Sequence, residues 1–417
     1  MQDKLLSQFE DQDFAEYVQY ATNKIKSGDK FEAKLLASIN QYPVSIREFI
    51  TSEYYLNQAG SIYPAVLDEL EALNNPKIEG LAHGSRIANV YTEAVFTGGI
   101  GVGKSHCSLL TIAYQLYILS CLDSPQALFD LDGSSEILFV FQTINATLAK
   151  QLDYARFKSM VEHSYYFREA FPFNRDIESE LQFPNRIIVR PVSGLETATI
   201  GQNIFGGVLD EVNFMKQTQN SKKSADAGGY DQAIQLYNSI ASRRKSRFMK
   251  HGRALGMLCL VSPKRYPNQF TDLRVAQANK ERQSKGSTSI FTYDKTRWEI
   301  KPDDFCGERS KVFVGDLSRK PRILFAGEET QANDLSLVTE IPIEYRPDFE
   351  TDTLRALREI AGKSTLSTHP FLVDSDKVSS CFGHTTTILS DVRTDFAGEP
   401  LKILSGHIKS PDELRFI

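Results

Sequence analysis

The stretch Gly98-Gly-Ile-Gly-Val-Gly-Lys-Ser105 fits the pattern G-x-x-x-x-G-K-[ST], and the fold can be worked out from it. Glycines let backbone N–H groups turn inward around phosphate oxygens, where side chains would obstruct the approach. In this pattern Lys104 reaches the β- and γ-phosphates of a nucleotide, and the Ser105 hydroxyl binds Mg²⁺. We therefore expect ATP to be bound by Gly98, Gly99, Gly101, Gly103, Lys104, Ser105 and His106.

The surroundings of this stretch favour a phosphate loop over the alternative, a glycine-rich turn that binds no nucleotide. An apolar run over 90–96 precedes it, and a helical pattern over 108–122 follows, with its N-terminus toward the anion. Further apolar runs lie at 137–141, 186–191, 205–209 and 255–261, separated by helical stretches. This alternation predicts an α/β fold, a P-loop NTPase core whose mainly parallel sheet is flanked by helices.

A second motif, Ile204-Phe-Gly-Gly-Val-Leu-Asp210-Glu211, is an apolar strand that ends in two acids. Asp210 would lie at the carboxyl edge of the sheet beside the phosphate loop and hold Mg²⁺, directly or through water. Glu211 would orient or deprotonate the attacking water, so Glu211 and Lys104 are the predicted catalytic residues. The alternative is that both acids only end a strand in solvent. A third strand ends at Ser262-Pro263, where Ser262 is a candidate for sensing the γ-phosphate, although a strand that simply stops at proline explains it equally well.

Composition excludes several classes of protein. The chain has 417 residues, a net charge of −5, 41% apolar and 24% charged residues, values typical of a globular protein and not of a disordered or membrane-embedded one. Its cysteines and histidines show no ligand spacing, so metal chemistry beyond Mg²⁺ is not expected. One dense basic run is either a solvated helix face or a DNA-phosphate contact. The run comprises Arg243, Arg244, Lys245, Arg247, Lys250 and Arg253.

In order and spacing, these motifs resemble those of large terminase subunits of tailed bacteriophages. The segments GGVLDEVNFM and LVSP match that pattern, and Ile341–Gly362 (IPIEYRPDFETDTLRALREIAG) is its most specific part. The resemblance implies an ATPase motor that moves double-stranded DNA into a procapsid, with Ser262 coupling hydrolysis to movement. It also implies a helical lid part over 1–85, an ATPase core over 86–270 and a C-terminal lid and linker over 271–417. The implied partners are double-stranded DNA, the portal protein and the small terminase subunit.

The same resemblance implies a homo-oligomeric ring on the procapsid, with a monomer in solution as the alternative. It implies a location in the host cytoplasm and no membrane contact. Some members of the family carry an arginine at the start of the phosphate loop, whereas Phe96-Thr97-Gly98 is neutral here. An arginine finger is therefore sought elsewhere. The candidates are Arg156, Arg168, Arg175 and Arg190.

Large terminase subunits usually continue into a nuclease domain, and we expect no nuclease activity from this chain alone. Its end, Leu414-Arg-Phe-Ile417, resembles the approach to the first strand of such a domain, and Asp374, Asp376 and Asp391 are expected to be solvated loop acids. Two other functions remain open at this point. One is a different DNA-dependent translocase such as a helicase, although no second α/β motor follows 263. The other is a nucleotide-gated assembly component with negligible turnover.

Overall fold

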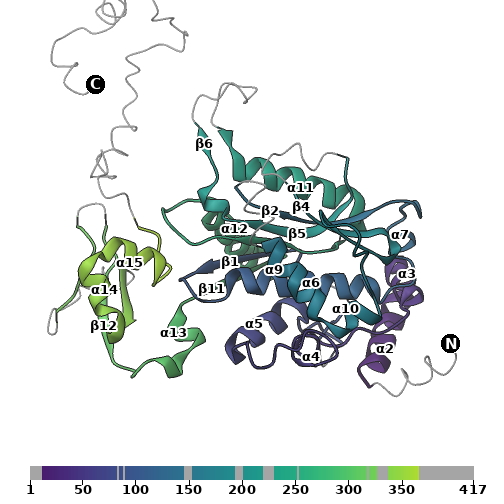
Figure 1. Cartoon of the computed structure of the whole chain (residues 1–417), viewed down its shortest axis with the longest axis horizontal. Helices are drawn as coiled ribbons and strands as arrows, with labels where there is room; N and C mark the ends of the chain where they lie inside the picture. Colours follow the sequence, from purple (N-terminus) through teal and green to yellow (C-terminus); the bar gives the residue numbers. More distant parts are fainter. Residues whose placement is uncertain are drawn as a thin grey trace, which may run out of the picture. The chain divides into compact units, whose positions relative to one another are not determined.

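The structure is a computed structural model that describes residues 12–81, 84–87, 90–144, 153–192, 201–218, 230–250, 253–316, 319–325 and 337–365. Its main sheet has seven strands in the order β11-β1-β10-β5-β2-β4-β3 (Figure 1). All neighbours are parallel except β3, which runs antiparallel to β4. The strands are β1 (Glu93–Gly98), β2 (Ile137–Gln142), β3 (Leu181–Phe183), β4 (Ile187–Pro191), β5 (Ile204–Asp210), β10 (Leu258–Val261) and β11 (Ile290–Lys295). The predicted α/β fold is thus confirmed.

Both faces of the sheet are buried, which explains why the central strands are apolar on consecutive residues. In β1, Ala94 and Phe96 belong to one core cluster, whereas Val95 belongs to the other. Phe139 and Val140 of β2 divide in the same way. Because side chains alternate across a strand, each of these strands supplies both cores.

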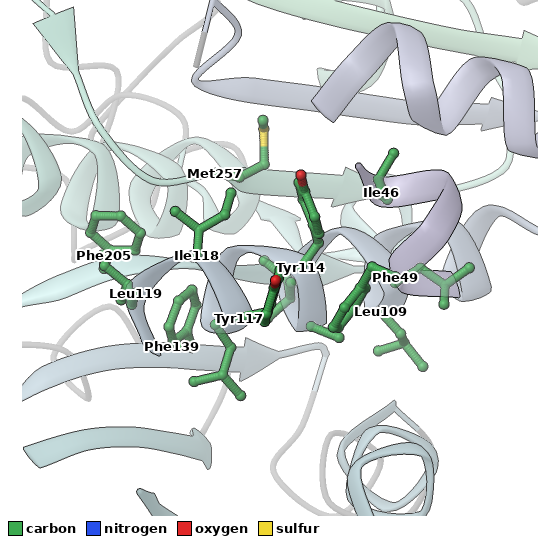
Figure 2. Packing of buried hydrophobic residues seen from close by; sticks show 14 of the residues in the cluster. Ile46, Phe49, Leu109, Tyr114, Tyr117, Ile118, Leu119, Phe139, Phe205 and Met257 are labelled. Atoms are coloured by element: carbon green, nitrogen blue, oxygen red, sulfur yellow. The ribbon is translucent and has the colours of Figure 1, made fainter. Parts of the chain in front are cut away.

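Helix α6 (Lys104–Ser120) fills the first face and is buried on all sides from Cys107 to Leu119. One side of it packs on the sheet, and the other packs on the N-terminal helices, as Figure 2 shows for Tyr117 beside Phe49 of α4 (Ile46–Thr51). The backbone of Val44 fixes this packing, because its carbonyl accepts from Tyr114 Oη (2.7 Å) and its N–H donates to Tyr117 Oη (3.1 Å). The N-terminal helices therefore share one core with the sheet.

The helices on this first side begin where the sequence places caps and proline. Ser45 caps α4, since its Oγ accepts from the Glu48 N–H (3.2 Å), and Pro64 opens α5. The bounds are α2 (Gln12–Lys26), α3 (Lys30–Ser38), α4 (Ile46–Thr51), α5 (Pro64–Asn74), α7 (Pro125–Leu128), α9 (Ala155–His163) and α10 (Tyr165–Glu169).

The opposite face of the sheet is covered by α11 (Gln232–Phe248) and α12 (Phe270–Lys285), which contribute Leu236, Ile240 and Ala278 to the second core. Short turns and two-residue strands complete this half. They are η2 (Pro184–Arg186), η4 (Val212–Phe214), β6 (Gln217–Thr218), β7 (Tyr230–Asp231), β8 (Met249–Lys250) and β9 (Arg253–Ala254). Among the described helices, none combines the length and apolarity needed to cross a membrane.

A small C-terminal module follows the connecting turns α13 (Arg297–Ile300) and η5 (Pro302–Asp304). Three antiparallel strands, β12 (Arg309–Phe313), β13 (Arg322–Ile323) and β14 (Val338–Pro342), pack with η7 (Ile343–Tyr345), α14 (Arg346–Thr351) and α15 (Thr353–Glu359). They enclose their own core around Phe349 and Leu357. All these elements lie in one compact unit, Met1–Val314 with Pro321–Thr365.

Two strands of the main sheet were not anticipated. The edge strand β3 is only three residues long, and β11 lies beyond residue 270, where the sequence placed the end of the ATPase core. Because β11 pairs with β1 along its whole length, the sheet draws on the segment assigned to the lid. The predicted domain boundaries, at 85/86 and 270/271, both stay predictions.

Candidate nucleotide site

The phosphate loop joins the carboxyl end of β1 to the N-terminus of α6. Gly98 has a φ of +108°, and a Cβ there would lie 2.2 Å from the Lys295 carbonyl oxygen, so no other residue fits. Gly103 is the N-cap of α6 with a φ of +79°, and no described side chain caps the helix. The first-turn N–H groups of α6 are therefore left for an anion, whose charge the helix dipole favours.

Lys104 lies folded over this loop. Its Nζ donates to the carbonyl oxygens of Gly98 (3.2 Å) and Gly99 (2.5 Å). Burial lowers the pKa of Lys104, and the carboxyl groups of Glu211 and Asp210 oppose that shift. The ammonium group is thus held between the loop and the two predicted acids, where nucleotide phosphates would replace the loop carbonyls.

The two acids lie one strand away from the loop. Strand β10 separates β1 from β5, and Val261 of β10 is level with Phe96 on one side and with Asp210 on the other. Asp210 is buried, and its pKa is raised by burial first and then by the charge of Asp153. The structure therefore brings Lys104, Asp210 and Glu211 to one edge of the sheet, as the sequence predicts.

Glu211 adopts an unusual backbone conformation for a residue with a side chain. Its φ is +57°, a left-handed conformation that costs free energy outside glycine and is often found at functional sites. Its Oε2 atom is buried and has no hydrogen-bond partner among the described residues. Burial raises the pKa of the Glu211 carboxyl, while the charge of Lys104 lowers it. A carboxylate with an unused acceptor beside a phosphate loop suits the orientation of a water molecule.

Asp153 is a member of the site that the sequence did not suggest. It precedes α9, is only 4% exposed, and its carboxyl hydrogen-bonds that of Asp210. Burial raises the pKa of Asp153 as well as that of Asp210, so a proton held between the two carboxyl groups would be favoured. A divalent cation could replace that proton. Among the described residues no group of three or more Asp, Glu, His or Cys side chains could hold a metal ion.

Ser262 and Asn213 connect the carboxyl edge of the sheet to the following helix. Ser262 is fully buried, and its Oγ accepts from the backbone N–H of Asn213, two residues after Glu211. The Asn213 amide in turn donates to the Pro263 carbonyl (2.9 Å) and to Thr271 Oγ1 at the start of α12 (2.7 Å). Sequence reasoning identified Ser262 but missed Asn213, which the polar residue two places after Glu211 could have suggested.

A cavity of about 670 Å³ opens against the first turn of α6. Its lining combines apolar side chains such as Leu109 and Met160 with polar ones such as His106 and Gln58. The Oε1 atom of Gln58 is buried without a hydrogen-bond partner among the described residues. Burial, and then the charge of Arg156, lowers the pKa of His106. The cavity therefore has a mixed apolar and polar lining next to the phosphate loop, and Gln58 in that lining has a side-chain oxygen without a described partner.

The C-terminal module closes over the first half of the phosphate loop. The Ile100 N–H donates to the Glu359 carbonyl (2.6 Å) at the end of α15. A Cβ on Gly362 would come within 2.7 Å of the backbone of Gly98 and Gly99. This close approach explains why glycine follows α15, and it ties the module to the loop that would bind phosphate.

A family model described as "Uncharacterized protein MJ0330, N-terminal P-loop domain" matches residues 14–313. The chain belongs to this family. It is therefore a P-loop NTPase of the MJ0330 family, in agreement with the loop and acids described above. No curated protein matches the chain.

Large terminases are among the solved structures similar to this MJ0330-family chain. The large terminase of bacteriophage HK97 has a TM-score of 0.43 and 11% identity, with 83% of this chain and 60% of that chain covered. The large terminase of a thermophilic bacteriophage has a TM-score of 0.39 and 11% identity, with 73% and 54% covered. This chain thus spans a little over half the length of those proteins.

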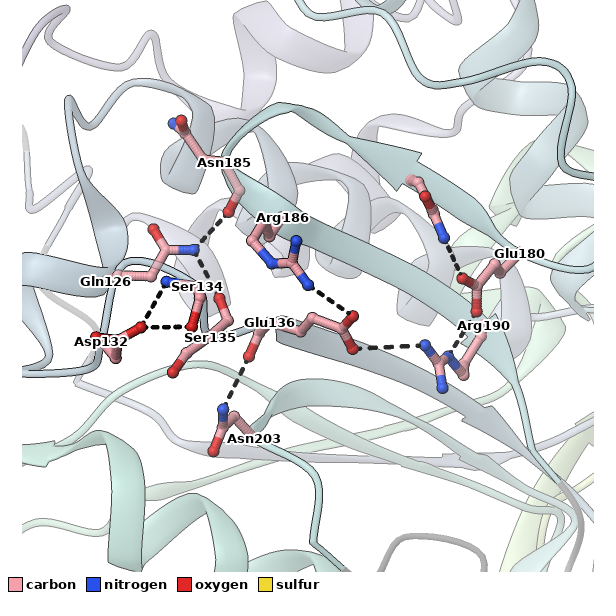
Figure 3. Close-up of polar contacts among 11 residues, drawn as sticks. Gln126, Asp132, Ser134, Ser135, Glu136, Glu180, Asn185, Arg186, Arg190 and Asn203 are labelled. Carbon is pink, nitrogen blue, oxygen red and sulfur yellow. Dashed lines mark hydrogen bonds and ion pairs between the residues drawn. The ribbon is translucent and has the colours of Figure 1, made fainter.

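The four arginine-finger candidates are placed differently in the MJ0330-family chain. Arg190 forms ion pairs with Glu180 (2.8 Å) and Glu136 (3.8 Å), which Figure 3 shows, so its charge is already compensated. Arg168 is exposed and lies over the Tyr165 ring, and Arg175 is exposed in a turn. Arg156 alone lines the cavity beside His106.

The predicted DNA-binding cluster needs a correction at Arg244. This side chain is 5% exposed, and its guanidinium donates to the carbonyls of Gly256 (2.8 Å), Thr92 (2.9 Å) and Phe205 (3.1 Å). It is a core residue, because every fourth position of α11 from Leu236 onward faces inward.

The other basic residues of the run differ in exposure. Lys250 pairs with Asp130 (2.7 Å), Arg243 donates to Ser239 within α11, and Lys245 and Arg247 are exposed. The side chain of Arg253, and the acids Asp374, Asp376 and Asp391, lie outside the residues that the structure describes.

Proposed function

We propose that this chain is an ATP-hydrolysing motor that moves double-stranded DNA, and that its biological role is genome packaging into a viral procapsid. The observation that carries the proposal is Glu211. Its strained backbone and its buried Oε2 without a partner among the described residues, one strand from Lys104, support water activation over passive nucleotide binding. A nucleotide-gated assembly component would need the cradle of the phosphate loop but not this acid.

In the proposed reaction, the triphosphate lies on the first turn of α6 and Lys104 moves from the loop carbonyls to the β- and γ-phosphates. Ser105 and Asp210, with Asp153 behind it, would hold Mg²⁺, which would neutralise charge on the phosphates. Glu211 takes a proton from water as the water oxygen bonds to the γ-phosphorus. The bond from that phosphorus to the bridging oxygen breaks, releasing ADP and inorganic phosphate.

We propose that the cavity beside His106 binds the adenine base. Its apolar walls suit a flat ring, and the unused Gln58 Oε1 would accept a hydrogen bond from the exocyclic amine. Guanine carries a carbonyl oxygen at the corresponding position and would leave Gln58 unpaired. The site would therefore prefer ATP to GTP.

Movement would arise at the contacts on either side of the nucleotide. Asn213 links the Glu211 turn to Ser262 and α12, and Thr365 donates its N–H to the Arg265 carbonyl (3.1 Å) just beyond β10. The C-terminal module also touches the phosphate loop through Glu359 and Ile100. A change at the γ-phosphate would thus be transmitted to the C-terminal module through both sets of contacts. Ser262 takes part in the first set through its bond with Asn213, which supports a coupling role for it.

The phosphates of DNA would bind to the basic side chains at the end of α11. These are Arg243, Lys245 and Arg247, because Arg244 is buried. We further propose a homo-oligomeric ring docked on the portal protein in the host cytoplasm, with the small terminase subunit delivering the DNA. These partners follow from the sequence resemblance.

The test is ATP turnover by the purified chain with Mg²⁺, measured with and without linear double-stranded DNA. We expect turnover that DNA stimulates, and none from the Lys104→Ala variant, which loses the phosphate contact. ATP turnover that DNA does not stimulate would contradict the proposed DNA translocase. ATP binding without turnover would favour the nucleotide-gated assembly component. Unwinding of forked DNA would favour a helicase.

A further inference from the structure

The loop after β10 enters the centre of the nucleotide site. Strand β10 lies between β1, which leads into the phosphate loop, and β5, which ends at Asp210. Parallel strands bring their carboxyl ends to the same edge, so the residues after Ser262 emerge between Lys104 and Glu211. The third of them is Arg265. No sequence motif pointed to this arginine.

The backbone of Arg265 is held on both sides. Its N–H donates to Gln269 Oε1 (3.1 Å), and its carbonyl accepts from the Thr365 N–H (3.1 Å). Gln269 also donates through Nε2 to the carbonyl of Asn213 (2.9 Å), in the turn that follows Glu211. These bonds fix the origin of the Arg265 side chain relative to the predicted catalytic acid.

The guanidinium group of Arg265 lies over the ring of Phe214, 4.6 Å from its centroid, and Phe214 is three residues after Glu211. Among the described residues Arg265 makes no ion pair. Burial raises the pKa of Glu211, but the charges of Lys104 and Arg265 both lower it, so both cations act on this carboxyl. Arg265 is thus a cation held on an aromatic ring beside the predicted catalytic acid, without an ion pair to any described residue.

Phosphoryl transfer spreads negative charge over the γ-phosphate oxygens, and a positioned arginine stabilises that charge. We propose that Arg265 contacts the γ-phosphate in cis and stabilises the transition state, a role that rests on the proposed ATP hydrolysis. Lys104 and Arg265 would approach the γ-phosphate from the loops that follow β1 and β10. The water oxygen bonds to phosphorus, its proton passes to Glu211, and the bridging oxygen leaves with ADP; Arg265 transfers no proton.

The arrangement also gives Arg265 a way to report the state of the nucleotide. Its carbonyl is bonded to Thr365, whose Oγ1 accepts from Arg358 of α15 (2.6 Å), and the Arg358 guanidinium lies 4.7 Å from the Tyr266 ring centroid. A movement of Arg265 toward phosphate would therefore displace Thr365 and, through Arg358, the C-terminal module.

The test compares wild type with Arg265→Ala and Arg265→Lys, with Arg282→Ala as the control. Arg282 is an exposed arginine in the last turn of α12 and belongs to no site described above. We expect Arg265→Ala to lower kcat about 10²–10³-fold while affinity for fluorescent ADP stays within about threefold of wild type. The tighter binding that aluminium fluoride gives with ADP should be lost. Arg265→Lys should restore part of kcat, since it keeps the charge without the fork.

Wild-type kcat in Arg265→Ala, with wild-type turnover established, would overturn the assignment of Arg265 and leave the proposed function intact. Equal losses of ADP binding and of turnover would mean a structural role and would also overturn it. If wild type binds ATP without turnover, the proposed function fails and this inference fails with it. Should Arg265→Ala melt far below wild type, the comparison of Arg265→Lys with wild type decides by the same readouts.

Discussion

Replacing Arg244 by methionine tests whether this cation belongs to the core or to a DNA-binding surface. Its guanidinium is enclosed between α11 and the edge of the sheet, where it donates to the carbonyls of Gly256, Thr92, Phe205 and, at 3.4 Å, Leu255. Burial lowers the pKa of Arg244 to about 10. Methionine would keep most of the side-chain volume and remove all of these bonds.

The magnitude follows from which contacts are lost. The Thr92 carbonyl also accepts from the Leu258 N–H, so the two short bonds to Gly256 and Phe205 matter most. Hydrogen bonds from a charged donor contribute about 1.5–3 kcal/mol each to stability. Part of this loss is offset because the substitution also removes the desolvation cost of the buried charge. We expect the free energy of unfolding to fall by about 2–5 kcal/mol, or roughly 3–8 °C in Tm for a domain of this size.

The assay is thermal unfolding followed by circular dichroism, with DNA affinity measured on the same samples below the transition. Arg247→Met is the matched control, since it lies on the exposed side of the same helix and should change stability by less than about 0.5 kcal/mol. A wild-type Tm for Arg244→Met together with weaker DNA binding would refute the core assignment.

The remaining predictions concern the metal site, the base cavity and the DNA surface. The pKa of Asp210 is higher in the folded state than in the unfolded state. The stability that its bound proton contributes is therefore fully present below the unfolded-state pKa and is lost as the pH rises through the folded-state pKa. Asp210→Asn should therefore lose less Tm than wild type between pH 6 and 9 without Mg²⁺, and it should lack Mg²⁺-dependent turnover; an equal loss of Tm would refute the shared proton. Gln58→Ala should reduce the ratio of kcat/KM for ATP over GTP about tenfold, and an unchanged ratio would place the base elsewhere. Neutralising Arg243, Lys245 and Arg247 should lower the slope of log affinity against log salt by up to about three; an unchanged slope would return them to a solvated helix face.

The local motifs could be predicted from sequence because their chemistry is contained in a few consecutive residues. Gly98–Ser105 must form a loop before a helix, and Asp210 and Glu211 end an apolar strand, whatever the rest of the chain does. The parallel sheet followed in the same way from consecutive apolar residues. These features depend on backbone geometry and burial, and both can be predicted from the residue types and their spacing.

Residues that meet only through the order of the strands could not be predicted. Asp153 precedes a helix, and Arg265 lies beyond a proline, so neither has a local pattern that points to Glu211. Arg265 reaches the site because β10 lies between β1 and β5, whereas Asp153 follows β2, which pairs with β5 on its other side. Arg244 is a different case, because it lies four residues from both Ile240 and Phe248, a spacing that places it on the buried side of α11. The sequence interpretation counted the charges of the run but did not consider which side of the helix each residue faces.

The central claim, that Glu211 activates water for ATP hydrolysis, is tested most directly by single-turnover hydrolysis of ATP by Glu211→Gln. Glutamine keeps the shape of the side chain but accepts no proton. We expect ATP affinity near that of wild type and hydrolysis slowed at least about 10²-fold, so that the variant holds ATP, whereas Lys104→Ala loses binding. Hydrolysis by Glu211→Gln at the wild-type rate would contradict the account.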